Sequence, residues 1–360
     1  MRRRPPARLE ILTIYRGIAA TLVVLFHYLR IAPLPSWTPM LPPDKPIGFF
    51  EFGHSGVDFF FVLSGFVMVW GYWHEAGDPR RLWPYLKARC ARIYPTYWAV
   101  FLLTALYLWT HPQVNDAALA PDALFREALL YPPGPFLVPP SGTLPYELVC
   151  YLGFAALFVV GPTLFSVAAL VWCGAVLAQW YDWTSVADSL WMSPRVLEWF
   201  LGAAGALFVL RVRPHVSALW LTLSAVAVLV MAVVDDVGIA RGGYHDIRNF
   251  ALPYLLVIVA GAGYELAAPR RYPWLLVLLG EASYSIYLTH FYLIRIVVYP
   301  VYGHPIIAAW LGSTVQDLAV LTIVLAGGVA CWAVIERPLL RRSRRFVGTR
   351  PHVRSAGGRP

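Results

Sequence analysis

Long apolar stretches recur along the chain, and short polar segments separate them. Apolar runs of about 18 residues or more are typical of helices that cross a lipid bilayer. The pattern gives ten candidate spans, at residues 11–30, 56–75, 92–110, 144–160, 163–180, 194–210, 216–234, 249–266, 273–293 and 317–336. The sequence therefore predicts an all-α fold, a polytopic integral membrane helix bundle of about ten transmembrane helices.

The composition strengthens the membrane interpretation. Hydrophobic residues make up 59% of the 360 residues, and charged residues only 14%. A soluble domain usually carries about twice that share of charge, because it needs a hydrated surface. The four cysteines are scattered and form no CxxC pair, so neither a disulfide framework nor a zinc site is expected.

The placement of the basic residues predicts the orientation of the bundle. With the amino terminus in the cytoplasm, 22 of the 29 Lys and Arg residues fall on cytoplasmic segments, as the positive-inside rule requires. Both termini are then cytoplasmic, and the protein is a multi-pass protein of the cell inner membrane. The net charge of +9 predicts contact with the anionic lipid bilayer, and no nucleic acid partner is expected. The predicted organisation is a basic N-terminal tail at 1–10, a transmembrane domain at 11–340 and a basic, disordered C-terminal tail at 341–360.

The first span carries two ionisable side chains, Arg16 and His27. Eleven positions amount to about three helical turns, so both side chains share one face, about 16 Å apart along the axis. Ionisable groups inside a bilayer usually face the bundle interior or a water-filled cavity. A histidine at such a position is often only a packing residue, but the face shared with Arg16 favours a functional role for His27.

The predicted topology also gives each ionisable residue a depth in the membrane. Asp58, Glu147, Glu198 and His290 fall in the outer half together with His27, which predicts one polar chamber open to the outside. Asp58 and Glu147 fit equally well as partners that tie helices together. Glu198 fits best as the partner of the arginine three residues before it, and His290 as an interfacial residue that reaches water.

A basic cluster lies at the inner face, at the start of the third span. Arg89 and Arg92 are spaced i,i+3 and share a helix face, and Lys87 is close by. Positive-inside anchoring explains the charges, but not their grouping just before Tyr94 and Pro95. Arginine forks match the oxygens of phosphate. The cluster is therefore a candidate site for the phosphates of a nucleotide-like donor.

Taken together, these motifs resemble the acyltransferase-3 family of polytopic membrane O-acyltransferases. The resemblance extends over residues 8–340. It rests on the Arg-x10-His pair at Arg16 and His27, GVDFFFVLSGFV at 56–67, the Arg-x-x-Arg pair at Arg89 and Arg92 followed by IYPTYW, TLPYE at 143–147, SYSIYLTHF at 283–291 and ERP at 336–338. Two positions depart from the family pattern. Pro145 stands where a Ser is usual, and Thr289 where Trp is common.

The resemblance implies an enzyme that moves an acyl group, most often acetyl, from cytoplasmic acyl-CoA to a hydroxyl of a carbohydrate or glycoside acceptor. His27 and Arg16 would then take part in catalysis. We expect His27 to act as a general base, with the carboxylate of Asp58 or Glu147 fixing its tautomer. Arg16 would bind the donor or stabilise developing negative charge.

The resemblance also implies where the donor binds. Arg89 and Arg92 would hold acyl-CoA, with Lys87 beside them. Glu336, in the ERP motif at the same depth, would organise this site. No metal is expected in it.

Two other functions fit the composition. A transporter or flippase also has many helices with intramembrane charges, but it usually shows repeats or paired half-helices, and the sequence shows none. A structural scaffold has no need for five ionisable groups within the membrane.

Many members of the family carry a second, soluble esterase-like domain. None is expected here, so a separate extracytoplasmic transferase is a candidate partner. The acceptor, the acyl chain length, the oligomeric state and the need for a partner domain stay open. So does the choice between direct transfer of the acyl group and an intermediate in which it rests first on His27.

Overall fold

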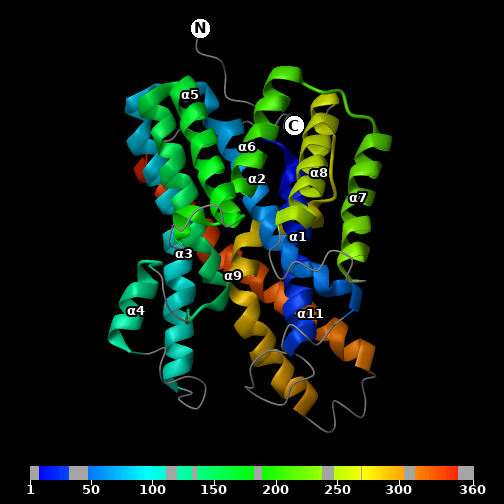
Figure 1. The fold of residues 1–360 in the computed structure, drawn as a ribbon. Coiled ribbons are helices and arrows are strands. Elements are labelled where there is room, and N and C mark those ends of the chain that lie inside the picture. Colours follow the sequence, from blue (N-terminus) through cyan, green and yellow to red (C-terminus); the bar gives the residue numbers. More distant parts are fainter. Residues whose placement is uncertain are drawn as a thin grey trace, which may run out of the picture.

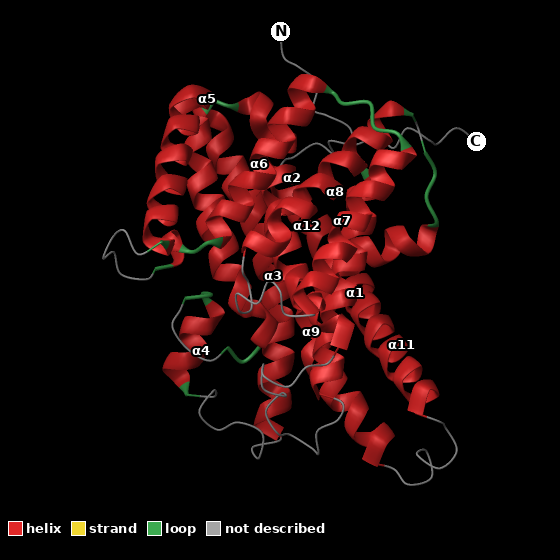
Figure 2. Cartoon of the chain, turned by 45° about the vertical axis from the view of Figure 1, so that its right-hand side comes forward, coloured by secondary structure: helices red, strands yellow, loops and turns green. Residues whose placement is uncertain are grey.

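The computed structural model describes residues 8–31, 48–110, 120–131, 136–181, 189–236, 247–268, 270–303 and 313–347. Every regular element in these ranges is a helix, as Figures 1 and 2 show. The predicted all-α fold is therefore confirmed for the part of the chain that the structure describes.

The helices follow the predicted spans closely. The long helices are α1 (Glu10–Ile31), α2 (Gly56–Tyr72), α3 (Leu82–Thr110), α5 (Leu144–Trp180), α6 (Arg195–Val212), α7 (Ala218–Asp236), α8 (Ile247–Ala267), α9 (Trp274–Gly303) and α11 (Ser313–Cys331). The short elements are η1 (Gly48–Ser55), η2 (Trp73–Glu75), η3 (Pro79–Arg81), α4 (Pro121–Ala128), η6 (Pro139–Thr143), η7 (Leu190–Met192), the π-helical turn η8 (Trp332–Glu336) and α12 (Arg337–Val347).

Two boundaries differ from the prediction. Helix α3 begins ten residues before the predicted span at 92–110, because the charged stretch that ends the apolar run is itself helical. Helix α5 contains two predicted spans, which meet at Gly161. This glycine has φ 77° and ψ 174° and precedes Pro162. Only glycine adopts such a conformation without strain, so the chain reverses here.

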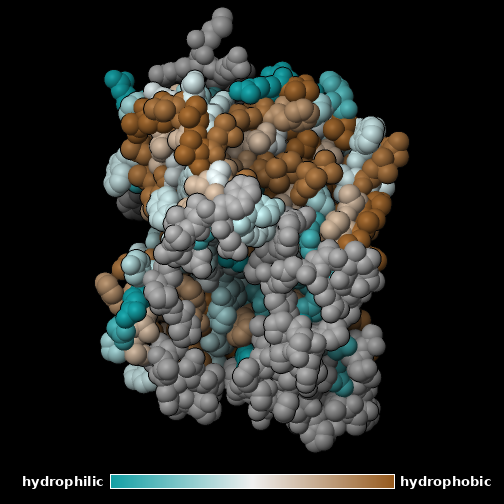
Figure 3. Space-filling view, in the orientation of Figure 1, coloured by the Kyte–Doolittle hydropathy of each residue, from teal (hydrophilic) through white to brown (hydrophobic). Residues whose placement is uncertain are grey.

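Six helical stretches are long and apolar enough to cross a membrane, judged by length and composition among the described residues. They are Glu10–Ile31, Phe50–Glu75, Pro139–Trp180, Ala218–Asp235, Asn249–Ala267 and Val315–Ser343. Helices α3, α6 and α9 are outside this set, because charged and hydroxyl-bearing residues interrupt their apolar sequence. Figure 3 shows a broad hydrophobic band across the upper half of one face. The exposed leucine and valine side chains of α5 and α7 are typical of a surface that faces lipid.

Small residues bring the central helices into close contact. A Cβ atom at Gly65 of α2 would lie 1.8 Å from the carbonyl oxygen of Trp199 on α6. A Cβ atom at Gly202 of α6 would lie 1.7 Å from the carbonyl oxygen of Val62. Such reciprocal contacts are typical of membrane helices, whose association depends on close packing rather than on the hydrophobic effect.

Helices α1 and α9 approach each other in the same way. A Cβ atom at Gly17 would lie 2.7 Å from the backbone nitrogen of Gly280. The neighbour of Gly17 along the chain is Arg16, so this contact fixes where the Arg16 side chain leaves the helix. The two helices stay in contact farther along, where they carry His27 and His290.

The predicted tails lie mostly outside the described residues. Residues 1–7 and 348–360 are not described. The first seven residues of the predicted C-terminal tail are helical rather than disordered, because α12 continues to Val347. Two of its arginines, Arg341 and Arg342, are exposed on this helix.

Candidate active site

A cavity of about 930 Å³, including its opening to solvent, lies among α1, α2, α3, α5 and α9. Four of the predicted site residues line it: Arg16, Arg89, Arg92 and Glu147. The rest of the wall is largely apolar and aromatic. A concave, mostly apolar site with a few convergent polar groups is the usual form of a small-molecule site.

Arg89 lies in an aromatic cage on the α3 side of this cavity. Its guanidinium donates to the hydroxyl of Tyr72 at 3.0 Å. The guanidinium carbon lies 5.4 Å from the ring centre of Tyr72, 5.9 Å from that of Tyr85 and 5.6 Å from that of Tyr151. Arg89 makes no ion pair with any described residue. Its charge is held by ring faces, and no described residue supplies a counter-ion.

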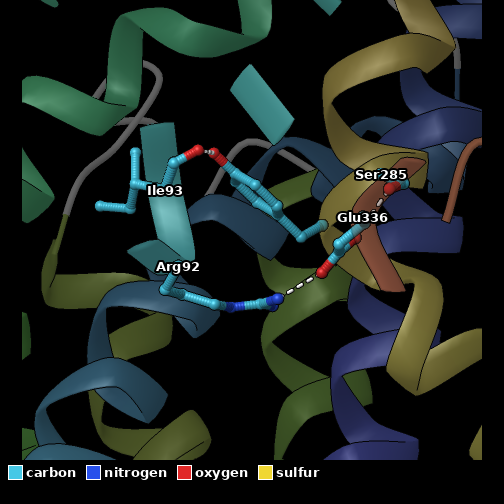
Figure 4. Close-up of polar contacts among 5 residues, drawn as sticks. Arg92, Ile93, Ser285 and Glu336 are labelled. Atoms are coloured by element: carbon cyan, nitrogen blue, oxygen red, sulfur yellow. Dashed lines mark hydrogen bonds and ion pairs between the residues drawn. The ribbon is translucent and has the colours of Figure 1, made fainter. Parts of the chain in front are cut away.

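Arg92 is paired instead of free. Its guanidinium bonds to the carboxylate of Glu336, and Ser285 donates to the other oxygen of that carboxylate at 2.7 Å (Figure 4). Glu336 is fully buried at the end of η8, a π-helical turn. Turns of this kind are frequent at functional sites. Tyr284 completes the group, since its ring lies 5.1 Å from the Arg92 guanidinium carbon and its hydroxyl donates to the carbonyl oxygen of Ile93 at 3.0 Å.

Glu147 presents a second carboxylate to the cavity. It lies in the first turn of α5 and accepts a hydrogen bond from Tyr151, one turn farther along the same helix. Ser64 of α2 makes long contacts of 3.4 Å to the Glu147 carboxylate and to the Tyr151 hydroxyl. Ser64 also lines the cavity.

Arg16 lies at the centre of this charge distribution. It lines the cavity, and among the described residues it makes no hydrogen bond and no ion pair. Arg92, Glu336 and Glu147 are close enough to act electrostatically on its guanidinium. Three guanidinium groups thus share two carboxylates, one of which already binds Arg92. This imbalance favours an anionic ligand in the cavity.

His27 does not line this cavity. Its Nδ1 lies 2.9 Å from the carbonyl oxygen of Val23 and 3.2 Å from Nε2 of His290 on α9. The ring of Phe291 flanks it, 6.0 Å between centres. His290 is fully buried, so the prediction that it is an interfacial residue reaching water is wrong.

Tyr287 connects the histidine pair to the cavity. Its side chain lines the cavity, and its ring centre lies 5.9 Å from that of His290. The Tyr287 hydroxyl is 3.0 Å from Oγ1 of Thr143, and the ring of Phe60 lies 6.0 Å away. Tyr287 therefore lies next to both the cavity and His290.

Asp58 lies apart from both groups. It is buried and hydrogen-bonds to Glu198 of α6, which is equally buried. The described contacts of His27 include no carboxylate, so Asp58 and Glu147 are not its partners in this structure. The expected local partner, Arg195, does act electrostatically on Glu198, but the hydrogen bond of Glu198 is to Asp58 on another helix. The guanidinium of Arg195 also lies over the Tyr146 ring, at 4.7 Å.

Lys87 points away from the cavity. It is exposed, and its ammonium group lies 5.3 Å from the ring centre of Trp83 on the same helix. Arg89 and Arg92 line the cavity while Lys87 does not, which follows from their spacing. Residues three apart share a helix face, but residues two or five apart are rotated away from it.

The tyrosines that hold the guanidinium groups are the residues that sequence reasoning missed. Tyr151 follows Glu147 by one helical turn, and Tyr284 and Ser285 stand within the SYSIYLTHF motif. The sequence shows these spacings, but it does not show which residues of other helices these side chains contact. Within the described ranges, no three His, Cys, Asp or Glu residues come together as a set of metal ligands.

Comparison with known proteins identifies the family. The model of the acyltransferase domain family matches residues 10–337. The chain belongs to this acyltransferase family. It is 28% identical over 344 residues to acyltransferase MdmB of Streptomyces mycarofaciens, covering 83% of this chain and 84% of that protein. It is 30% identical over 310 residues to the exopolysaccharide production protein ExoZ of Rhizobium meliloti (strain 1021), covering 82% of this chain and 92% of that protein. No solved structure matches.

Membership decides between the functions that the composition allows. The protein is an enzyme that transfers acyl groups other than aminoacyl groups, and it is a multi-pass membrane protein. The family match begins at α1 and ends within the ERP motif. It therefore includes every residue that lines the cavity.

Proposed function

We propose that this acyltransferase takes an acyl group, acetyl in the first instance, from cytoplasmic acyl-CoA and transfers it to a hydroxyl of an extracytoplasmic carbohydrate or glycoside. In this proposal the bundle has ten transmembrane helices, both termini are cytoplasmic, and the protein lies in the cell inner membrane. The relative ExoZ is named for exopolysaccharide production, which supports a carbohydrate acceptor.

One observation carries the proposal. Arg16 and Arg89 line the cavity, and neither has a carboxylate partner among the described residues. An uncompensated guanidinium group inside a membrane protein is costly, and a polyanionic ligand relieves that cost. The phosphates of acyl-CoA have the required charge, and guanidinium forks fit their oxygens.

The reaction places a different demand on each group. The proton of the acceptor hydroxyl goes to Nε2 of His27, and the hydroxyl oxygen bonds to the acyl carbon. The bond from that carbon to sulfur breaks, and His27 returns the proton to the leaving thiolate, so that CoA leaves as a thiol. Arg16, a fixed cation that lines the cavity, holds the negatively charged donor. No proton is gained or lost overall.

The position of Tyr287 sets the order of events. The donor occupies the cavity first, and its acyl end reaches His27 past the Tyr287 ring. The pantetheine arm is long and thin, which suits such a passage. The acceptor approaches from the opposite side, next to His27. Bound donor and acceptor would meet where the two compartments adjoin.

The first experiment measures binding of radiolabelled acetyl-CoA to purified protein in nanodiscs. Arg89→Met removes the free charge and keeps the length of the side chain, and Lys87→Met on the same helix is the matched control. We expect Arg89→Met to lose binding, while Lys87→Met and His27→Ala retain it. His27→Ala should then fail to form acetylated product with methyl glycosides as acceptors. Equal binding by wild type and Arg89→Met, or no binding by wild type, would refute the donor site.

A further inference from the structure

The histidine pair carries an inference that rests on the proposed function and adds a residue to it. We infer that His290 is a positioning residue, which holds His27 in the tautomer whose Nε2 has a free lone pair. The argument follows from which atoms face each ring nitrogen. It needs no carboxylate beside His27, and the described contacts of His27 include none.

The proton on His290 is fixed by its own helix. Nδ1 of His290 lies 2.7 Å from the carbonyl oxygen of Tyr287. A carbonyl oxygen only accepts hydrogen bonds, so Nδ1 must carry the proton. In a neutral imidazole the other nitrogen is then an acceptor. Nε2 of His290 therefore offers a lone pair to whatever lies next to it.

The atom next to it is Nδ1 of His27, at 3.2 Å. The same nitrogen of His27 lies 2.9 Å from the carbonyl oxygen of Val23. Both neighbours are acceptors, so Nδ1 of His27 carries the proton and divides it between them. Nε2 of His27 is left as the basic nitrogen. No described residue forms a hydrogen bond with Nε2, so this nitrogen is available to an acceptor hydroxyl.

His290 adds something that Val23 alone does not provide. A backbone carbonyl on the same helix leaves the imidazole free to turn about its side-chain torsions. A second acceptor on α9 fixes the plane of the ring, since the proton on Nδ1 must point between the two. Full burial of His290 and the neighbouring ring of Tyr287 hold the second acceptor in place. The neutral lone pair also accepts from the imidazolium that forms when His27 takes up a proton.

The chain offers variants that separate shape from hydrogen bonding. His290→Phe keeps a ring of similar size but has no acceptor. His290→Gln can place its carbonyl oxygen where Nε2 stands, whereas the shorter His290→Asn cannot. We expect His290→Phe and His290→Asn to lower kcat about 100-fold, the loss typical of a misplaced reacting group, with acetyl-CoA binding unchanged. His290→Gln should recover most of this loss. Unchanged kcat in His290→Phe, or an equal loss in His290→Gln and His290→Asn, would overturn the inference.

Solid-state NMR tests the tautomer without any catalytic turnover. Protein labelled with ¹⁵N-histidine would be compared with the His27→Gln variant, and the difference assigns the His27 signals. We expect a protonated Nδ1 and an unprotonated Nε2 in the wild type, and a mixture of tautomers in His290→Phe. A His27 protonated at Nε2 in the wild type would overturn the inference. If His290→Phe does not fold, the Gln and Asn variants and the wild-type spectrum still decide.

The two proposals fail in different ways. If wild type transfers no acetyl group but shows the expected tautomer, the proposed function fails and the assignment of His290 as the partner that fixes His27 stands. If wild type transfers acetyl and His290→Phe is equally active, the proposed function stands and the role of His290 fails.

Discussion

Breaking the Arg92–Glu336 pair from either side should have unequal consequences. The side chain of Glu336 is 0% exposed and that of Arg92 is 26% exposed. Arg92→Met leaves a fully buried carboxylate with one donor, Ser285, so we expect the free energy of unfolding to fall by about 3 kcal/mol. Glu336→Gln leaves the Arg92 guanidinium unpaired, but this cation still reaches the cavity. The amide oxygen introduced at position 336 still accepts a hydrogen bond from Ser285. Its cost should be about 1 kcal/mol.

The double variant Arg92→Met/Glu336→Gln removes both charges and should be more stable than Arg92→Met by about 1–2 kcal/mol, because neighbouring sites in one network are not additive. The free energy of unfolding would be measured by SDS titration in mixed micelles for all four proteins. Additive losses, or a larger loss in Glu336→Gln than in Arg92→Met, would refute this account of the pair. The result also bears on donor binding. Lost binding in an Arg92 variant can reflect an unpaired Glu336, whereas Arg89 has no carboxylate partner in the described part of the chain to leave behind.

Three further predictions concern other parts of the molecule. Gly65→Ala should prevent α2 and α6 from packing and yield little folded protein, because the new Cβ would meet the Trp199 carbonyl at 1.8 Å. Gly71→Ala on the same helix has nothing within 4 Å and should leave the yield and the melting temperature in detergent unchanged or slightly raised. Glu127→Gln should lower the melting temperature, because the Glu127 carboxylate accepts from the backbone N–H groups of Leu137 at 2.5 Å and Val138 at 2.9 Å, and an amide has only one oxygen to offer. The expected loss in the free energy of unfolding is about 1–2 kcal/mol. An unchanged melting temperature would show that these two hydrogen bonds contribute nothing to stability. Burial raises the pKa of the Glu127 carboxyl, so the folded state holds this proton more tightly than the unfolded state, and its contribution to stability falls as pH rises from about 4.3 through the folded pKa. If the stability of wild type relative to Glu127→Gln rose with pH in this range, the predicted direction would be wrong.

Helix positions were predictable because the bilayer imposes a strong and simple pattern. Each predicted span coincides with a described helix, and the errors are at boundaries. The start of α3 was not predicted, because Lys87, Arg89 and Arg92 interrupt the apolar run. Lysine and arginine are nevertheless good helix formers. The reversal at Gly161 was placed correctly, between two predicted spans, because a Gly-Pro pair interrupts the apolar run there.

For the site residues, the sequence predicted only their depth in the membrane. The positive-inside rule gives a depth for each charge, but it says nothing about the order of helices around the bundle. Five ionisable residues were expected in one outer chamber. The structure divides them among three places: His27 with His290, Asp58 with Glu198, and Glu147 in the cavity with Arg16. The pairing of His27 with a residue 263 positions away depends on the packing of α1 against α9, which no local pattern reports.

The position of Tyr287 has a consequence for the cell as well as for the reaction. Under the proposed function, the enzyme takes its donor on one side of the membrane and its acceptor on the other. It would then contain a path through the bilayer, and a continuous wet path would dissipate the proton gradient. The Tyr287 ring lines the cavity, lies next to His290 and contacts Thr143 and Phe60. Under the proposed function it is the side chain that would close this path. Such a barrier can be opened by the arriving acyl end and closed again behind it. Electrical insulation of the membrane would then depend in part on Tyr287, and the permeability of vesicles containing this protein becomes as informative as its turnover.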